Sequence, residues 1–251
     1  MIFTRELVGK VALVTGGSSG IGKATAFAFA RAGATVVIAS RRIAEGEETV
    51  HQICERGGDA IFVTTDVSKD NDVRSLIDKT VDMFGNLDFA FNNAGGWIMG
   101  LLTEQSEEDW DRIMDMNLKG TWLCLKYELS AMLKRGSGSV VNMASVAGVT
   151  GMAGFSIYSA SRGGIIALTR AAAVEYAKSG IRINSISPGT IKTPALDTAS
   201  ADMLAQNAAL HPIGRIGQPE EIAEAVVWLC SDKASFVTGH NLVIDGGYTI
   251  Q

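Results

Sequence analysis

Tyr158 and Arg162 have residue types and a spacing that suit acid–base chemistry. They are four residues apart, so on a helix they lie one turn apart on the same face. A phenol ordinarily keeps its proton until about pH 10, and a permanent cation beside it favours the phenolate. Such a tyrosine can give or take a proton near neutral pH. Ser145, at the end of an apolar run, adds a hydroxyl that could hold a carbonyl oxygen.

Short apolar runs alternate with amphipathic segments along the chain. Strands are expected at 11–14, 35–39, 60–65, 87–91, 139–143, 181–187 and 242–245. Helices are expected at 23–32, 43–56, 68–84, 106–114, 117–134, 157–178 and 219–231. Apolar strands that alternate with helices predict a parallel sheet covered on both faces. The expected fold is therefore a doubly wound α/β domain that spans residues 1–251.

A glycine-rich segment, Thr15-Gly-Gly-Ser-Ser-Gly-Ile-Gly22, lies between the first expected strand and the first expected helix. Gly16, Gly20 and Gly22 would permit a tight turn and close approach of the backbone to a pyrophosphate, at which the helix N-terminus directs free N–H groups. The spacing is Gly-x-x-x-Gly-x-Gly, which differs from the dinucleotide fingerprint Gly-x-Gly-x-x-Gly. The alternative is a tight strand-to-helix turn that binds no ligand.

The second expected strand ends in Ala39-Ser40-Arg41-Arg42, with no acidic residue to bind the ribose hydroxyls of NAD. Arg41 can bind a 2′-phosphate with a planar, charge-assisted fork. NADP is therefore favoured over NAD. The alternative is that both arginines are merely solvated.

Composition excludes several classes of protein. The net charge is -5 without a basic cluster, so nucleic acid and anionic membranes are poor partners. The N-terminus has no apolar signal core, and the uncharged segment 136–161 is too rich in small polar residues to span a membrane. Cys54, Cys124 and Cys230 are expected to be three buried thiols in a reducing compartment, and the histidines lack metal-ligand spacing. We expect a cytoplasmic domain without a metal.

These residues together resemble the short-chain dehydrogenase/reductase family over nearly the whole chain. The motifs that carry the resemblance are Thr15 to Gly22, Asp66-Val67, Asn92-Asn-Ala-Gly95, Asn117, Ser145, Tyr158, Pro188-Gly189 and Asp245-Gly-Gly247. The resemblance implies a single Rossmann-type domain with a seven-stranded parallel sheet, usually a homotetramer. It also implies hydride transfer between a nicotinamide and a carbonyl or alcohol carbon.

The resemblance assigns roles to individual residues. Tyr158 would be the acid/base, Ser145 would orient the substrate oxygen, and Asn117 would hold a water in the proton relay. The residues expected to contact the dinucleotide are Gly16, Ser18, Ser19, Gly20, Ile21, Gly22, Ser40, Arg41, Arg42, Asp66, Val67, Asn93, Ala94, Gly95, Tyr158, Arg162, Pro188, Gly189, Ile191 and Thr193.

Arg162 departs from the family pattern, which is Tyr-x-x-x-Lys. The family lysine is thought to bind the nicotinamide ribose, activate the tyrosine and join the relay. Arginine keeps the charge but presents a rigid, bulkier fork that stays protonated. Electrostatic activation of the tyrosine is therefore expected to persist, with ribose geometry and relay altered.

Residues 190–215 follow a strand end without clear periodicity, where the ligand crevice of such a sheet opens. We expect a mobile lid there, with residues 96–99 and 152–155 as apolar wall on either side. A small or medium apolar ketone, or its secondary alcohol, fits best. Lys192 is a candidate anchor for a charged group.

Three functions follow from this pattern. The first is an NADP(H)-dependent carbonyl reductase or alcohol dehydrogenase. The second is a sensor or scaffold that binds the cofactor with little turnover because of Arg162. The third is an NAD-dependent alcohol or sugar dehydrogenase in which Arg41 does not contact the cofactor.

Overall fold

Seven parallel strands form one sheet in the computed structural model, which describes residues 6–251. The strand order is β3-β2-β1-β4-β5-β6-β7. The strands are β1 (Val11–Thr15), β2 (Thr35–Ser40), β3 (Ala60–Thr64), β4 (Phe89–Asn92), β5 (Gly138–Met143), β6 (Ile181–Pro188) and β7 (Asn241–Ile244). The expected doubly wound α/β fold with a seven-stranded parallel sheet is confirmed.

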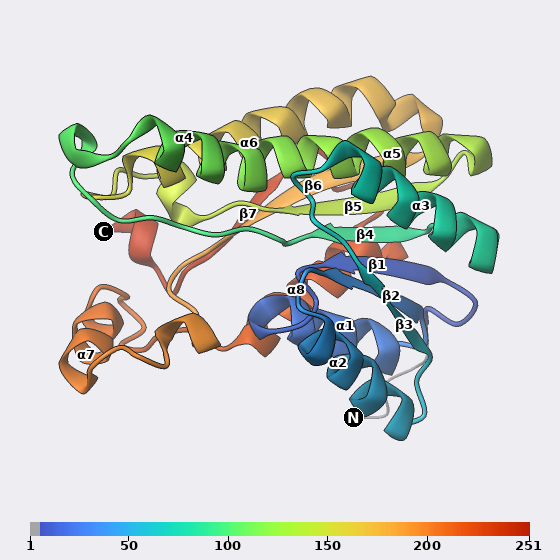
Figure 1. The fold of residues 1–251 in the computed structure, drawn as a ribbon, viewed down its shortest axis with the longest axis horizontal. Coiled ribbons are helices and arrows are strands. Elements are labelled where there is room, and N and C mark those ends of the chain that lie inside the picture. Colours follow the sequence, from blue (N-terminus) through green and yellow to red (C-terminus); the bar gives the residue numbers. More distant parts are fainter. Residues whose placement is uncertain (1–5) are drawn as a thin grey trace.

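Helices cover both faces of the sheet (Figure 1). They are α1 (Gly20–Arg31), α2 (Ile43–Glu55), α3 (Asp70–Phe84), α4 (Glu107–Met114), α5 (Gly120–Arg135), α6 (Ser156–Tyr176), α7 (Ala201–Ala209) and α8 (Pro219–Cys230). In Figure 1, α1, α2 and α8 lie on one face, and α3, α4, α5 and α6 lie on the other. No helix in the part of the chain that the structure describes is long and apolar enough to cross a membrane.

Successive strand residues point into two different cores, as the pleat of a strand requires. Val14 packs with α1 and α8, whereas its neighbour Leu13 packs with α3, α5 and α6, and both are fully buried. Burial on both faces is why these strands read as continuous apolar runs.

Helix α7 stands apart from both layers in Figure 1 and lies inside the segment expected to be an irregular lid. Sequence analysis missed it because its residues show no clear apolar period. The Ser200 hydroxyl caps it by accepting a hydrogen bond from the Met203 backbone N–H at 3.2 Å. A serine cap of this kind is a signal that sequence reading could have used.

Some local predictions are confirmed and others are wrong. The sequence Ser106-Glu-Glu-Asp109 resembles a capping box, and the structure confirms it at the start of α4, where the Ser106 hydroxyl and the Asp109 carboxylate bind each other's backbone N–H groups. Ser68, at the start of the helix expected over 68–84, is a plausible N-cap by residue type, but α3 begins after Lys69 and the Ser68 hydroxyl instead binds Asp66 at 2.8 Å. Cys54 was expected to be buried and is exposed.

The strand order reverses beside β1, which pairs with β2 on one side and β4 on the other. In open α/β sheets the ligand crevice lies outside the carboxyl ends of the strands at such a switch point. Here those ends are Thr15 and Asn92, which are directly paired. The fold therefore directs attention to the glycine loop and to residues 92–96.

Candidate active site

The glycine loop is fastened to the end of β4. The Asn93 side-chain amide donates to the carbonyl oxygens of Thr15 at 3.0 Å and Gly16 at 3.3 Å. A Cβ on Gly22 would overlap the Gly16 carbonyl oxygen, so the first turn of α1 can pack on the loop only with glycine there. Ser19, the N-cap residue of α1, makes no side-chain cap bond. The amides of this helix start are therefore available to an anion.

A pocket of about 220 Å³ adjoins this loop. Its lining includes Gly16, Ser18, Ser40, Arg41, Arg42, Asp66, Val67, Ala94 and Gly95. These residues were all expected to contact a dinucleotide, and the structure brings them together.

Arg42, more than Arg41, connects the second strand to the glycine loop. Its Nη2 donates to the Ser18 hydroxyl at 3.1 Å and also to the Ser19 hydroxyl. Sequence reasoning gave the main role to Arg41, because the spacing between the two segments does not show which arginine turns toward the loop. Burial raises the pKa of Asp66, but hydrogen bonds from Ser68 and the charge of Arg41 outweigh it, so the pKa lies below its usual value.

Asn117 lies in a π-helical segment, Asp115–Lys119, that joins α4 to α5. Its Oδ1 accepts from the Gly96 N–H, and its Nδ2 donates to the Gly96 carbonyl oxygen, each at 2.9 Å. The same Nδ2 donates to the Ser161 hydroxyl at 3.0 Å. Both amide hydrogens are thus used, one to hold the backbone after β4 and one to bind Ser161 of α6. Of the side-chain atoms of Asn117, only Oδ1 keeps a lone pair to which a relay water could donate.

Arg162 is a buried cation beneath Tyr158. Its Nη1 donates to the Met143 carbonyl oxygen at 2.7 Å, and its Cζ lies 5.0 Å from the centre of the Tyr158 ring. Nε is buried without a hydrogen-bond partner, and none of the ion pairs in residues 6–251 involves this guanidinium. A Cβ on Gly95 would lie 2.7 Å from Nη2 and 2.8 Å from the Asn117 Oδ1, so glycine allows both side chains to approach.

Ser145 follows β5 and is buried. Its Oγ accepts from the Ala147 N–H at 3.1 Å, which leaves the hydroxyl hydrogen for another acceptor. The short helix after it, Val146–Gly148, packs against α6, the helix that carries Tyr158. Within the described residues the Tyr158 hydroxyl has no hydrogen-bond partner. Both hydroxyls can therefore bind a substrate oxygen.

An aromatic chain extends from Tyr158 into the adjoining loops. The Phe155 ring lies 6.1 Å from the Tyr158 ring and 6.2 Å from the Trp97 ring. The Gly100 N–H donates to the Gly154 carbonyl oxygen at 2.9 Å. Loops 96–99 and 152–155 were expected on opposite sides of the substrate, but this bond joins their neighbourhoods into one wall.

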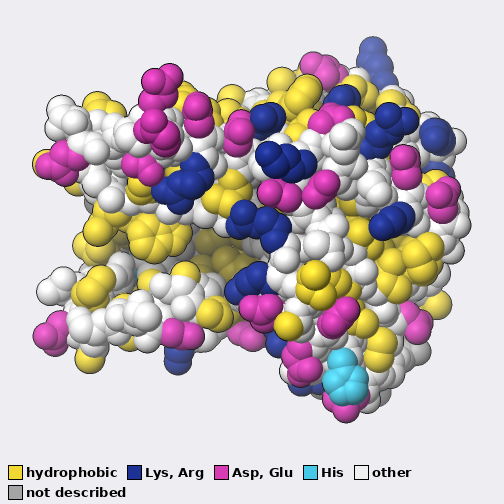
Figure 2. Space-filling view, in the orientation of Figure 1, with side chains coloured by type: hydrophobic (Ala, Val, Ile, Leu, Met, Phe, Trp, Pro, Cys, Tyr) yellow, Lys and Arg dark blue, Asp and Glu magenta, His cyan; other side chains and the backbone are white. Residues whose placement is uncertain are grey.

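Figure 2 shows a hollow between the body of the molecule that holds α4 and α6 and the smaller body around α7, with hydrophobic side chains at its mouth and floor. The aromatic chain belongs to the first of these bodies and the 190–215 segment to the second. The hollow therefore lies where the substrate cleft was expected, and its two walls come from distant parts of the sequence.

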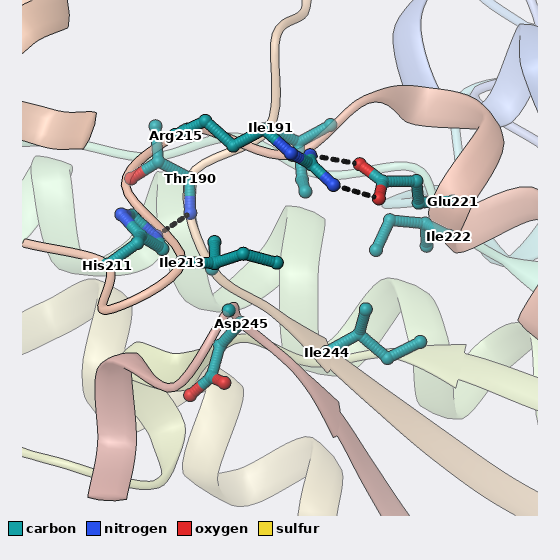
Figure 3. A pocket seen from close by; sticks show the side chains of 12 residues that line it. Thr190, Ile191, His211, Ile213, Arg215, Glu221, Ile222, Ile244 and Asp245 are labelled. Atoms are coloured by element: carbon teal, nitrogen blue, oxygen red, sulfur yellow. Dashed lines mark hydrogen bonds and ion pairs between the residues drawn. The ribbon is translucent and has the colours of Figure 1, made fainter. Parts of the chain in front are cut away.

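The base of the 190–215 segment is closed by a bridge between its ends. The Thr190 carbonyl oxygen accepts from the Gly217 N–H, and the Lys192 backbone N–H donates to the Gly217 carbonyl oxygen, each at 2.9 Å. Figure 3 shows His211 turned toward the Thr190 N–H, which donates to its Nε2 at 3.1 Å. The His211 Nδ1 lies 2.7 Å from the Asn207 carbonyl oxygen, so this ring is the Nδ1–H tautomer. Sequence reasoning missed this buried histidine, because an isolated His carries no spacing signal.

A cavity of about 160 Å³ lies under this base. Figure 3 shows two of its lining residues paired, the Arg215 guanidinium with the Glu221 carboxylate, through two hydrogen bonds of 2.7 Å each. This pairing and a bond from the Gln218 N–H lower the pKa of Glu221 to about 2. The bonds of His211 and Arg215 in this lining therefore hold the base of the 190–215 segment in place.

The lid segment also reaches the glycine loop. The methyl group of Thr193 would lie 3.1 Å from a Cβ placed on Gly20. Pro188, Gly189 and Ile191 lie between the end of β6 and this contact. The residues expected at the nicotinamide end therefore lie beside the loop expected at the pyrophosphate. Among residues 6–251, no group of three or more His, Cys, Asp or Glu side chains could hold a metal ion.

Comparisons with known proteins give related sequences and one shared architecture. A family profile described as enoyl-(acyl carrier protein) reductase matches residues 16–249. A cyclohexanol dehydrogenase of Acinetobacter sp. (strain SE19) is 43% identical, in an alignment that covers 99% of this chain and 98% of that protein. A 2,5-dichloro-2,5-cyclohexadiene-1,4-diol dehydrogenase of Sphingobium indicum is 45% identical and covers 97% and 98%. A crystal structure of a short-chain type dehydrogenase/reductase from Mycobacterium marinum superposes with a TM-score of 0.94 at 36% identity, covering 98% of each chain.

Proposed function

The chain belongs to the short-chain dehydrogenase/reductase family, and from that premise we propose that it is an NADP(H)-dependent oxidoreductase that interconverts apolar ketones and secondary alcohols. The observation that carries the proposal is the pair formed by Tyr158 and the buried Arg162, whose Cζ lies 5.0 Å from the phenol ring. A buried cation without a carboxylate partner stabilises a negative charge placed next to it. The phenolate that remains when Tyr158 gives up its proton would be that charge.

In the reductive direction, Tyr158 gives its hydroxyl proton to the carbonyl oxygen of the substrate, while the Ser145 hydroxyl donates a hydrogen bond to the same oxygen. Arg162 stabilises the phenolate that remains, and a proton from solvent restores the phenol. Oxidation of the alcohol reverses each of these transfers. Asn117 contributes by holding the Gly96 backbone at the floor of the site.

The residues present fit a dinucleotide. The glycine loop would hold the pyrophosphate, because no side chain caps the N-terminal amides of α1 that follow it. Asp66 and Val67 would hold the adenine, and the unpaired Nε of Arg162 would take an oxygen of the nicotinamide ribose. When bound, the nicotinamide supplies the hydride for reduction or accepts it in oxidation.

Replacement of either Arg41 or Arg42 by alanine should raise the Kd for NADPH at least tenfold and leave the Kd for NADH within twofold. Both arginines line the pocket, and Arg42 already binds Ser18 and Ser19 at the loop. Each would lose a charge-assisted contact with the 2′-phosphate, which is about 1.5 kcal/mol or more. Fluorescence titration of both cofactors measures the effect, and the exposed Arg74→Ala is the control. Equal losses for NADH and NADPH would contradict a 2′-phosphate site and favour the NAD-dependent alternative.

Six-membered alicyclic ketones and alcohols are the proposed substrates. The aromatic chain of Trp97, Phe155 and Tyr158 offers flat apolar surface to a ring. The two dehydrogenases of Acinetobacter and Sphingobium are named for cyclohexanol and a cyclohexadiene diol, and both align over nearly this whole chain.

Phe155→Ala should lower kcat/KM for cyclohexanone by about 10-fold to 100-fold, because one apolar wall contact of the ring is lost. The loss for acetone, which is too small to span the wall, should be less than threefold. Initial rates of NADPH oxidation give both values. Phe236→Ala is the matched control, since that ring is fully exposed. Equal losses for the two ketones would show that Phe155 acts on Tyr158 and not on ring recognition.

The proposed function is tested by NADPH oxidation with a panel of cyclic and linear ketones and diketones. We expect turnover with cyclohexanone and its substituted forms, and the reverse reaction with the corresponding alcohols and NADP⁺. Binding of NADPH without turnover on any member of the panel would refute an oxidoreductase and leave a cofactor-binding protein.

A further inference from the structure

A buried polar network runs across β4 and β5, on the face of the sheet that α5 and α6 cover, next to the active site. Asn92 at the end of β4 donates through Nδ2 to the Glu128 Oε2 at 2.9 Å and to the Asn142 Oδ1 at 3.0 Å. The Asn142 Nδ2 donates to the Thr169 hydroxyl on α6 at 2.9 Å. At most 3% of any of these four residues is exposed. Glu128, on α5, is the only acidic member of the network.

Two acceptor atoms in this network are buried and have no hydrogen-bond partner. They are the Asn92 Oδ1 and the Glu128 Oε1, and they belong to a pair that is already joined by one hydrogen bond. Both hydrogens of the Asn92 amide are used. A flipped Asn92 would turn its oxygen toward two further acceptors, so no reorientation of that amide satisfies the pair. What the pair lacks is one proton.

We propose that Glu128 is a neutral carboxylic acid in the working protein, that its Oε1–H donates to the Asn92 Oδ1, and that it is a positioning residue for the glycine loop. The Asn92 Oδ1 and the Glu128 Oε1 then each have a hydrogen-bond partner. The carboxylic acid and the carboxamide form a doubly hydrogen-bonded pair. Loss of the proton would leave a buried anion that receives a single hydrogen bond, from Asn92. The structural part of the inference stands alone, and its effect on cofactor binding rests on the proposed function.

Among residues 6–251, no cation lies against Glu128 that would favour its ionised form. Burial raises the pKa of Glu128 to about 7, against the lowering effect of the hydrogen bond from Asn92. The facing groups on β4, β5 and α6 are the neutral members of the network. On α5 itself, burial and the neighbouring Glu128 raise the pKa of the Cys124 thiol, so that group is neutral too. The ion pair between Lys126 and Asp70 of α3 is half exposed, on the solvent side of the helix.

The network connects to both halves of the active site through the chain. Asn92 precedes Asn93, whose side chain holds the carbonyl oxygens of Thr15 and Gly16. Asn142 precedes Met143, whose carbonyl oxygen accepts from Arg162. A shift at the Glu128–Asn92 pair therefore acts directly on the anchor of the glycine loop.

Glu128→Gln tests whether Glu128 is protonated. At every pH, glutamine supplies Asn92 with one donor group and one acceptor group, as the protonated Glu128 would. The pKa of Glu128 is raised from 4.5 to about 7, so the protonated form stabilises the fold at low pH and this contribution is lost as the pH rises through 7. Between pH 5 and pH 8.5, the unfolding constant of wild type should rise relative to that of the glutamine variant, by up to about 75-fold. Urea unfolding at a series of pH values measures this difference. If the unfolding constants of wild type and Glu128→Gln change in parallel with pH, the proposal is overturned.

The pH dependence of the Kd for NADPH distinguishes a positioning role of Glu128 from a merely structural one, which would leave this Kd unchanged. From pH 6 to pH 8.5, the Kd of wild type should rise about threefold or more beyond any rise seen in Glu128→Gln. Titration of the 2′-phosphate affects both proteins equally and cancels. Glu175→Gln, an exposed carboxylate on α6, should follow wild type. A wild-type Kd that tracks the glutamine variant would refute the positioning role.

Infrared spectroscopy of wild type answers the same question without a variant. The carbonyl stretch of a protonated carboxylic acid should be present at pH 6 and disappear with a midpoint near 7. Its absence at pH 6 would overturn the proposal even if Glu128→Gln does not fold. Failure of all these proteins to bind NADPH would refute the proposed function and leave the infrared and unfolding results as the test of Glu128.

Discussion

Tyr158→Phe should lower the turnover number for ketone reduction by about 10²-fold to 10⁴-fold, the usual contribution of a positioned acid or base. The variant keeps the ring that packs between Phe155 and Arg162 and removes only the hydroxyl that would give up the proton. NADPH binding should therefore stay within threefold of wild type. Single-turnover rates with saturating cofactor measure the chemical step, and a parallel titration measures the Kd.

The matched control for this substitution is Tyr176→Phe, at the far end of the same helix α6. It should leave the turnover number unchanged. If Tyr158→Phe retains more than about a tenth of wild-type turnover, another group is the acid and the role assigned to Tyr158 is wrong.

The fold could be read from the sequence because its strands are buried on both faces. Continuous apolar runs such as Val11–Thr15 have one explanation when helices alternate with them, and their observed bounds differ by a residue or two from those expected. The π-helical segment Asp115–Lys119 could not be read. It contains Asn117, whose bonds to the Gly96 backbone form only between segments that the folded chain brings together.

The candidate site was predictable where its residues lie in one helix, strand or turn, because the function then requires a fixed spacing between them in the sequence. Tyr158 and Arg162 are such a pair, and the Cζ-to-ring distance of 5.0 Å agrees with the expected helical face. Contacts between distant segments were not predictable. Arg42 turns toward Ser18, and Glu128 meets Asn92, only because the sheet sets their elements side by side. A glutamate within an amphipathic helix gives no sign that it is fully buried.

Arg162→Met should lower the turnover number at least about 10²-fold, whereas Arg162→Lys should match or exceed wild type. Methionine removes the cation that stabilises the Tyr158 phenolate and leaves the Met143 carbonyl oxygen without its donor. Lysine keeps the charge and one donor, and its compact ammonium fits the family pattern of Tyr-x-x-x-Lys. The same measurements as for Tyr158 apply, with the exposed Arg170→Met as the control on the same helix.

The comparison of these variants decides what Arg162 does in this protein. The guanidinium is buried, lacks an ion-pair partner in the described chain and has an unpaired Nε, so its free energy is high until an anion or a ribose oxygen reaches it. If wild type and Arg162→Lys both turn over ketone, arginine is a working substitute and the site is that of a reductase. If both bind NADPH and only the lysine variant reduces ketone, the unpaired charge of Arg162 contributes to cofactor binding and not to catalysis. The protein would then be a cofactor sensor in which one side chain has separated recognition of the nucleotide from the chemistry.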